Sequence, residues 1–148
     1  VLTSAIAGFL YWNWPRAKIF MGDVGSTQLG FILIILGIYY HNTMEFSILN
    51  WIMLSSPFWF DATLTLLRRI RNKENISTAH RKHAYQRLVQ SGLSHLKVDL
   101  LLIGLNILII CLIFVYREVR GIRVFAYILS IVVLYAVTLT IDKRLPFK

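Results

Sequence analysis

The feature that most constrains this chain is a series of long apolar runs separated by short, densely charged stretches. The runs cover residues 1–12, 26–40, 46–67, 100–116 and 124–141. Because the hydrocarbon core of a bilayer is about 30 Å thick and a helix rises about 1.5 Å per residue, roughly 20 apolar residues are needed to cross it. The last three runs have or approach that length, and the run at 26–40 predicts a short or tilted span. We therefore expect an all-α, polytopic integral membrane bundle with about five transmembrane spans.

Composition also indicates a membrane protein. Hydrophobic residues make up 57% of the chain and charged residues only 16%, and the charged residues are clustered rather than spread along amphipathic faces. The single cysteine, Cys111, lies within an apolar run, where it is expected to pack as a small hydrophobic side chain. The chain begins with Val1 and its first run has no basic flank, so we expect a truncated product rather than a signal peptide. Without repeats or a soluble domain, residues 1–148 are expected to form a single membrane domain.

The placement of positive charge predicts orientation. In a soluble protein a formal charge of +9 would suggest nucleic acid, but here eight of the sixteen lysines and arginines lie in one connection, residues 68–97. Cytoplasmic loops collect Lys and Arg, so we expect this loop to be cytoplasmic. The same rule places two further segments inside: that of Arg16 and Lys18, and the tail at 143–148. The connections at 41–45, with no Lys or Arg, and at 117–123, with three, should then face outward, although the second fits poorly.

The segment NWPRAKIFMGDVGS, residues 13–26, contains the residue types of a metal–phosphate site. Its one carboxylate, Asp23, is flanked by glycines and precedes a helix expected to begin near Ser26. Mg²⁺ takes one or two carboxylates and shares its other positions with water and phosphate oxygens. Free N–H groups at the helix start and the charge of Lys18 would attract an anion. A turn that ends one helix and caps the next would have the same sequence, so both interpretations stay open. The segment is not a Walker A loop, because no lysine follows the second glycine.

A second candidate is Asp61, within an apolar run. It lies seven residues before Arg68, which would place it about 10 Å inside the membrane. Ionisable groups at that depth usually face a protein interior or a water cavity and are functional candidates. The alternative is a structural hydrogen bond to a neighbouring helix, because Pro57 frees a carbonyl one turn back and marks a kink that needs local support.

The basic connection is the third candidate. Residues 78–91 contain good helix formers, Gly92 could supply a left-handed cap, and Ser94 could cap the next span. A helix over 78–91 would be amphipathic, with its cationic and proton-bearing groups on one face. That face would be formed by His80, His83 and Arg87.

Two histidines and two arginines in this connection could bind a diphosphate. Arg81 and Arg87 would act through the bidentate guanidinium, and His80 and His83 as hydrogen-bond donors or proton carriers. Basic residues beside a membrane more often meet anionic lipid head groups, and that alternative also stays open.

The motifs and their order resemble the polyprenyl-phosphate N-acetylhexosamine-1-phosphate transferase superfamily, glycosyltransferase family 4, which includes the phospho-N-acetylmuramoyl-pentapeptide transferases. The resemblance rests on N-x-P-x-A-K-I-F-M-G-D-V-G-S, PFWFDATLTLLRR and HRKHAYQRLVQSGLSH, within residues 10–97. It implies that Asp23 is a catalytic or Mg²⁺-binding residue and that Asn13 lies by the nucleotide pocket. Of the family's H-x-H-H motif only His83 is matched. The form H-R-x-H-A-Y-Q resembles the subgroup acting in O-antigen synthesis rather than peptidoglycan synthesis.

The implied reaction transfers a sugar-1-phosphate from a UDP-N-acetylhexosamine, or its deoxy derivative, to polyprenyl phosphate, with undecaprenyl phosphate as the expected lipid, and releases UMP. It belongs to cell-envelope glycan synthesis at the bacterial inner membrane, with Mg²⁺ as cofactor. The expected partners are the UDP-sugar, the lipid, the membrane and a second copy of the chain, with no nucleic acid. The family has an Asp-Asp motif in an earlier loop, and no acid precedes Asp23 here, so the fragment alone is expected to be inactive. The competing class is a non-enzymatic module, such as a transporter half with a lipid-docking loop.

Overall fold

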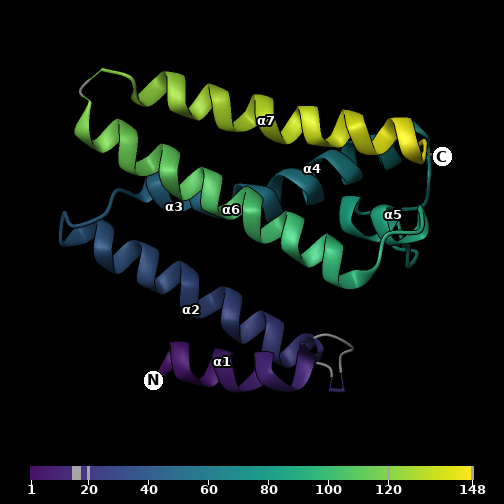
Figure 1. Cartoon of the computed structure of the whole chain (residues 1–148), viewed down its shortest axis with the longest axis horizontal. Coiled ribbons are helices and arrows are strands. Elements are labelled where there is room, and N and C mark those ends of the chain that lie inside the picture. Colours follow the sequence, from purple (N-terminus) through teal and green to yellow (C-terminus); the bar gives the residue numbers. More distant parts are fainter. Residues whose placement is uncertain (15–17, 20, 120, 148) are drawn as a thin grey trace. The chain divides into compact units, whose positions relative to one another are not determined.

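The computed structural model describes residues 1–14, 18–19, 21–119 and 121–147. Within these ranges the regular structure is helical and consists of seven α-helices (Figure 1). The chain divides into two compact units, Val1–Ile48 and Leu49–Lys148. The predicted all-α class is confirmed.

The first unit contains α1 (Leu2–Asn13) and α2 (Gly22–Asn42). The sequence predicts a short or tilted span over residues 26–40, whereas α2 has 21 residues and is long and apolar enough to cross a membrane. The difference arises because the glycine-rich turn before Ser26 is already helical from Gly22 onward.

The second unit contains two longer apolar helices, α6 (His95–Glu118) and α7 (Arg123–Arg144), which pack along each other (Figure 1). The shorter helices α4 (Ser56–Arg71) and α5 (Ala84–Gln90) contact both of them. Among the described helices, three are long and apolar enough to cross a membrane: α2, α7 and residues His95–Arg117 of α6.

The apolar run at 46–67 is divided into α3 (Ile48–Leu54) and α4, so it forms two helices rather than one span. The break occurs because the hydroxyl of Ser55 donates to the carbonyl oxygen of Trp51 at 2.8 Å, and Pro57 has no N–H to continue the helical ladder. The indole N–H of Trp59 donates to the carbonyl of Ile52 at 2.8 Å. The carbonyls of Trp51 and Ile52 beside the break are therefore satisfied by nearby side chains.

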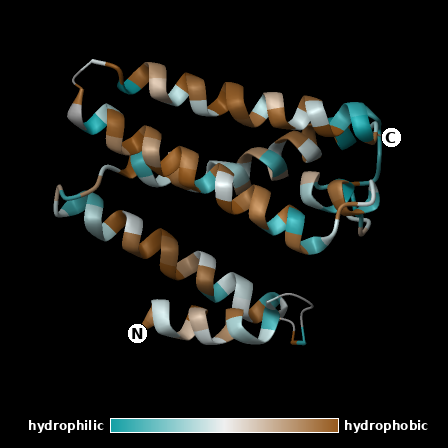
Figure 2. Cartoon of the chain, viewed as in Figure 1, coloured by the Kyte–Doolittle hydropathy of each residue, from teal (hydrophilic) through white to brown (hydrophobic). Residues whose placement is uncertain are grey.

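The core of the second unit follows one face of α7. Its buried residues recur every three or four positions, as one face of a helix requires; they are Ala126, Ser130, Leu134, Thr138 and Ile141. Several are small, which permits close approach of neighbouring helices. The other faces of α6 and α7 expose large apolar side chains, and hydrophobic residues predominate along both helices (Figure 2). Such a surface suits contact with lipid rather than water.

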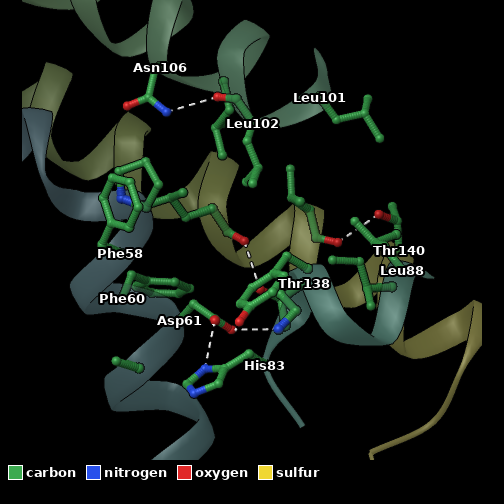
Figure 3. A pocket seen from close by; sticks show the side chains of 18 of the residues that line it. Phe58, Phe60, Asp61, His83, Leu88, Leu101, Leu102, Asn106, Thr138 and Thr140 are labelled. Carbon is green, nitrogen blue, oxygen red and sulfur yellow. Dashed lines mark hydrogen bonds and ion pairs between the residues drawn. The ribbon is translucent and has the colours of Figure 1, made fainter. Parts of the chain in front are cut away.

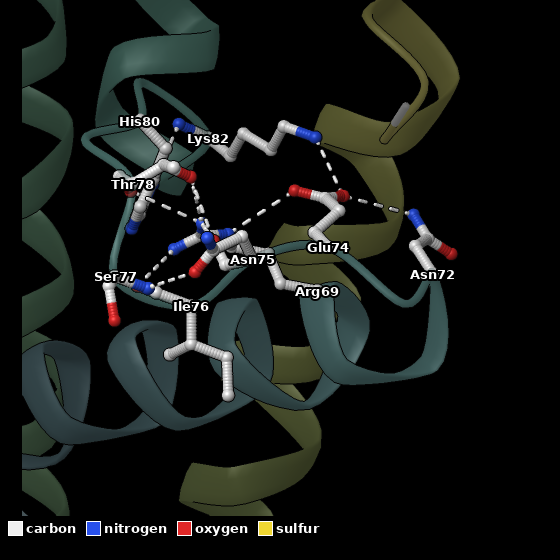
Figure 4. Close-up of polar contacts among 9 residues, drawn as sticks. All are labelled: Arg69, Asn72, Glu74, Asn75, Ile76, Ser77, Thr78, His80 and Lys82. Carbon is white, nitrogen blue, oxygen red and sulfur yellow. Dashed lines mark hydrogen bonds and ion pairs between the residues drawn. The ribbon is translucent and has the colours of Figure 1, made fainter.

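The connection between α4 and α5 differs from the prediction. A helix over residues 78–91 is wrong in extent, since α5 covers only Ala84–Gln90. The guanidinium of Arg69, which is buried, donates to the carbonyl oxygens of Asn75 and Thr78 and pairs with Glu74 at 3.2 Å (Figure 4). These contacts hold the connection in an irregular conformation before the helix begins.

The end of α5 agrees with the prediction. Gly92 has a φ of +96°. Its backbone N–H donates to the carbonyl of Val89 at 3.0 Å, and the backbone N–H of Leu93 donates to the carbonyl of Leu88 at 3.2 Å. This pair of bonds is a Schellman motif. Ser94 then caps α6, because its hydroxyl oxygen accepts the N–H of Lys97 at 3.4 Å.

Candidate functional site

Asp61 on α4 and His83, directly before α5, face each other in the second unit (Figure 3). The His83 Nδ1 and Asp61 Oδ2 atoms are 3.0 Å apart. The other oxygen, Oδ1, accepts the backbone N–H of Ala84 at 2.9 Å and the hydroxyl of Thr65 at 3.4 Å. Because a carboxylate only accepts hydrogen bonds, the proton of this pair lies on Nδ1, which leaves Nε2 available to another group.

Local structure also orients the His83 ring. His83 is the N-cap residue of α5, with extended backbone, and its own N–H donates to the side-chain oxygen of Gln86 at 3.3 Å. The ring stacks on Tyr85 with centroids 6.1 Å apart, and the ring of His80 lies 5.0 Å away. Burial and the nearby Arg69 guanidinium lower the pKa of His80. His80 therefore favours its neutral form beside His83.

The Asp61–His83 pair lies on the wall of a cavity of about 570 Å³ enclosed by α4, α5, α6 and α7. Most of the wall is apolar and includes Leu88, Leu101 and Leu102 (Figure 3). The polar groups on it are few; they are Asp61, His83, Tyr85, Asn106, Thr138, Thr140 and Arg144. A cavity of this kind suits a ligand with a long apolar part and one polar end.

The structural alternative for Asp61, a hydrogen bond to a neighbouring helix, also matches these contacts, because Asp61 accepts the backbone N–H of Ala84 at the start of α5. The carbonyls of Trp51 and Ile52 near the kink are already satisfied by Ser55 and Trp59. Asp61 instead ties α4 to the residues that open α5. Two of its contacts reach across to the start of α5, and a third hydrogen bond, from Thr65, stays within α4.

The expected common face of His80, His83 and Arg87 is wrong, because neither histidine lies within α5. Arg87 is buried, and its guanidinium donates to Asp142 Oδ1 at 2.7 Å and to the carbonyl of Leu145. Arg81 is exposed, and its guanidinium has no partner within the described part of the chain. The structure thus brings His80 and His83 together and turns Arg87 toward α7.

Sequence reasoning missed Asp142. This carboxylate accepts two bonds from Arg68, at 2.9 and 2.7 Å, besides the one from Arg87. A signal was present, because Asp142 is the one acid in α7, directly follows the apolar run at 124–141 and stands before two basic residues.

The first unit holds the glycine-flanked Asp23. The expectation that Asp23 precedes the helix is wrong, because α2 begins at Gly22 and Asp23 lies in its first turn. Gly22 has a φ of +66°, which lets the chain enter the helix sharply. Asp23 is exposed, and its backbone carbonyl accepts the hydroxyl of Ser26 at 3.1 Å, whereas its carboxylate has no hydrogen bond to the described residues.

Two other predicted site residues in this unit are described. The Lys18 ammonium lies 5.6 Å from the centroid of the Trp12 ring. The side-chain oxygen of Asn13 is buried and lacks a hydrogen-bond partner among the described residues, so it is a polar atom available to a ligand. Arg16, which the orientation prediction used, lies outside the described residues.

An Mg²⁺ ion is compatible with Asp23 as one ligand. Its carboxylate is exposed and takes part in no hydrogen bond or ion pair with the described chain, and Mg²⁺ commonly binds one or two carboxylates with water and phosphate. Among the described residues, no group of three or more His, Cys, Asp or Glu side chains could hold a metal. Water and phosphate oxygens would therefore have to complete the coordination.

The fold and the long apolar helices define a membrane protein of the helical class. Residues 1–41 match the model of glycosyl transferase family 4. A probable undecaprenyl-phosphate N-acetylglucosaminyl 1-phosphate transferase of Bacillus subtilis is 43% identical over 98 residues, which are 64% of this chain and 27% of that protein. The decaprenyl-phosphate N-acetylglucosaminephosphotransferase of Mycobacterium leprae is 34% identical over 115 residues, 69% of this chain and 29% of that protein.

A phospho-N-acetylmuramoyl-pentapeptide-transferase of an Arthrobacter species is 57% identical over 30 residues, 20% of this chain and 8% of that protein. The chain thus spans less than a third of the length of these relatives. No solved structure matches it. The resemblance predicted from the motifs is confirmed: the chain is a relative of the glycosyl transferase family 4 proteins that act on polyprenyl phosphates.

Proposed function

We propose that the chain is part of an enzyme that transfers an N-acetylhexosamine 1-phosphate from a UDP-sugar to a polyprenyl phosphate and releases UMP. The names of the Bacillus and Mycobacterium relatives support this reaction and favour N-acetylglucosamine as the sugar. The structural observation that carries the proposal is the His83 ring, held by Asp61 on the wall of a largely apolar cavity.

In this reaction an oxygen of the lipid phosphate attacks the β-phosphorus of the UDP-sugar. A new P–O bond forms to the lipid phosphate, the bond between the β-phosphorus and the bridging oxygen breaks, and UMP leaves with that oxygen. Phosphoryl transfer depends on positioning and on neutralising charge on the phosphate oxygens. The protein therefore needs oriented donors more than a covalent nucleophile.

His83 is placed to be such a donor. When both ring nitrogens carry protons, the Asp61 carboxylate stabilises the imidazolium through Nδ1, and its Nε2–H can donate a hydrogen bond to a phosphate oxygen. Arg81, exposed and without a partner in the described chain, can add positive charge from the same connection. His80 lies beside His83, with ring centroids 5.0 Å apart, and is a proposed second contact to the substrate.

The apolar wall of the cavity suits the isoprenoid part of the acceptor lipid. Leucines of α5 and α6 line it, and the polar pair Asp61 and His83 lies on the same wall. A lipid whose chain contacts the leucines would present its phosphate to His83. Because the acceptor is a membrane lipid, an enzyme built from membrane helices can reach its phosphate without removing the isoprenoid chain from the bilayer.

Mg²⁺ would bind Asp23 and neutralise the diphosphate of the UDP-sugar. Asn13, with its unpaired side-chain oxygen, and Lys18 are the proposed sugar-nucleotide contacts in the same unit. The loop at residues 68–97 would face the cytoplasm, where the nucleotide is present. An O-antigen type of glycan and a homodimer stay predictions from the sequence.

The proposal is tested by measuring UMP release from UDP-N-acetylglucosamine by the purified full-length protein in detergent. We expect release that requires both undecaprenyl phosphate and Mg²⁺ and that stops when EDTA removes the metal. A membrane module without enzymatic activity would release no UMP under any of these conditions. Release without the lipid would indicate hydrolysis rather than transfer.

A further inference from the structure

Asp142, near the end of α7, joins two helices at one carboxylate. It pairs with Arg68 of α4 through both guanidinium nitrogens, at 2.9 and 2.7 Å, and with Arg87 of α5 at 2.7 Å. The Arg87 side chain is 5% exposed. A guanidinium so far from water depends on its partner, and its removal would leave an uncompensated charge.

The two helices that Asp142 joins also carry the two members of the candidate site. Asp61 precedes Arg68 on α4, and His83 lies one turn before Arg87 at the start of α5. The position of α5 against α4 therefore depends on two contacts, one between Asp61 and His83 and one through Asp142.

Phe147 covers the same cluster. Its ring centroid lies 5.2 Å from the guanidinium carbon of Arg68 and 5.4 Å from that of Arg87, with the ammonium of Lys82 at 5.5 Å. An aromatic ring near several cations attracts them and shields the ion pairs from water. The carbonyl of Leu145 accepts a further bond from Arg87.

We infer that Asp142 is a positioning residue for His83, an inference that rests on the proposed transferase function. Without its carboxylate, the guanidinium groups of Arg68 and Arg87 face each other without a counter-charge. Repulsion then separates α4 from α5, and the His83 ring loses its placement beside Asp61. Asp142 acts through His83 and does not itself touch the substrate.

The test is Asp142→Asn in the full-length protein, alone and combined with His83→Ala. We expect the single change to lower kcat about 10- to 30-fold while KM for the UDP-sugar stays within about threefold. If Asp142 acts through His83, adding Asp142→Asn to His83→Ala lowers kcat no further. Asp142→Glu, which keeps the charge, should restore kcat to within about threefold of the unchanged protein.

Asp99→Asn is the matched control, since Asp99 is an exposed carboxylate on α6 away from the cluster. It should leave kcat unchanged. The inference would be overturned if Asp142→Asn lowered kcat by the same factor with and without His83→Ala. A loss of folded protein would lower activity equally in both backgrounds. If Asp142→Asn does not fold, Arg68→Gln replaces it, because this change keeps the Arg87–Asp142 pair. Arg68→Gln should lower kcat less than about 10-fold, and should lower it no further when His83→Ala is already present. Failure of the unchanged protein to release UMP would instead contradict the proposed function.

Discussion

The imidazole of His83 and the carboxylate of Asp61 are 3.0 Å apart, although the residues are 22 positions apart in the sequence. The same carboxylate accepts the N–H of Ala84. The contact therefore fixes both the ring of His83 and the backbone that follows it. It joins the basic connection to an apolar helix at the wall of a cavity.

His83→Ala should lower kcat of the full-length protein at least about 100-fold, because it removes a donor to the transferring phosphates. His95→Ala should have little effect, since His95 is exposed at the start of α6. The loss of kcat caused by His80→Ala should lie between those caused by His83→Ala and His95→Ala. Kinetics at saturating UDP-sugar and Mg²⁺ measure this order. Equal losses for His83→Ala and His95→Ala would show that the connection is a structural or lipid-docking element.

Asp61→Asn should lower kcat about 10- to 100-fold, because a hydrogen bond to a charged group contributes about 1.5–3 kcal/mol. The amide has the shape of the carboxylate and can still accept the N–H of Ala84, but it cannot neutralise an imidazolium at His83. Asp99→Asn makes the same chemical change at an exposed position and should be neutral. Activity within a few-fold of the unchanged protein would show that Asp61 serves only to join α4 to α5.

Asp23→Asn should nearly abolish turnover while the protein still inserts into the membrane. The change keeps the size of the side chain and removes the charge that would bind Mg²⁺. Activity is measured over a titration of Mg²⁺, with membrane insertion checked by fractionation. Mg²⁺-dependent turnover within a few-fold of the unchanged protein would exclude Asp23 as the metal ligand.

The pKa of His80 should lie below its ordinary value of 6.5, because burial and the Arg69 guanidinium disfavour the charged ring. NMR of histidine-labelled protein measures it directly. As the pH falls below 6.5, the unfolded chain takes up this proton before the folded protein does, so stability decreases until the folded pKa is reached. His80→Gln should therefore weaken the loss of thermal stability between about pH 7.5 and 5.5. A His80 midpoint above 6.5 would contradict the structure.

The orientation prediction is tested by cysteine labelling in intact cells, using a full-length protein whose other cysteines have been replaced. An impermeant thiol reagent should reach Thr43→Cys, in a connection without Lys or Arg, and should miss Lys73→Cys in the basic connection. Opening the cells should expose Lys73→Cys to the reagent. The reverse pattern in intact cells would invert the topology.

Much of the helical structure could be predicted because its causes are local. The length of the apolar runs predicted α6 and α7, and residues next to the helix ends predicted the Gly92 and Ser94 caps. The division of the run at 46–67 was harder, since side-chain bonds from Ser55 and Trp59 to the carbonyls of Trp51 and Ile52 accompany the break before Pro57. The sequence identified His83 and Asp61 as separate candidates, but it did not predict their contact.

The sequence by itself determined the helical class, the apolar surface and the candidate residues, because run length, charge clustering and caps depend on neighbours a few positions away. Only the tertiary structure decided which charges pair. Arg69 binds the connection that follows α4 and prevents the longer helix expected there. Arg87 meets Asp142, 55 positions away, and Asp61 meets His83. Such pairs form where packing of the helices removes charged groups from water, so each requires a partner that no local pattern specifies.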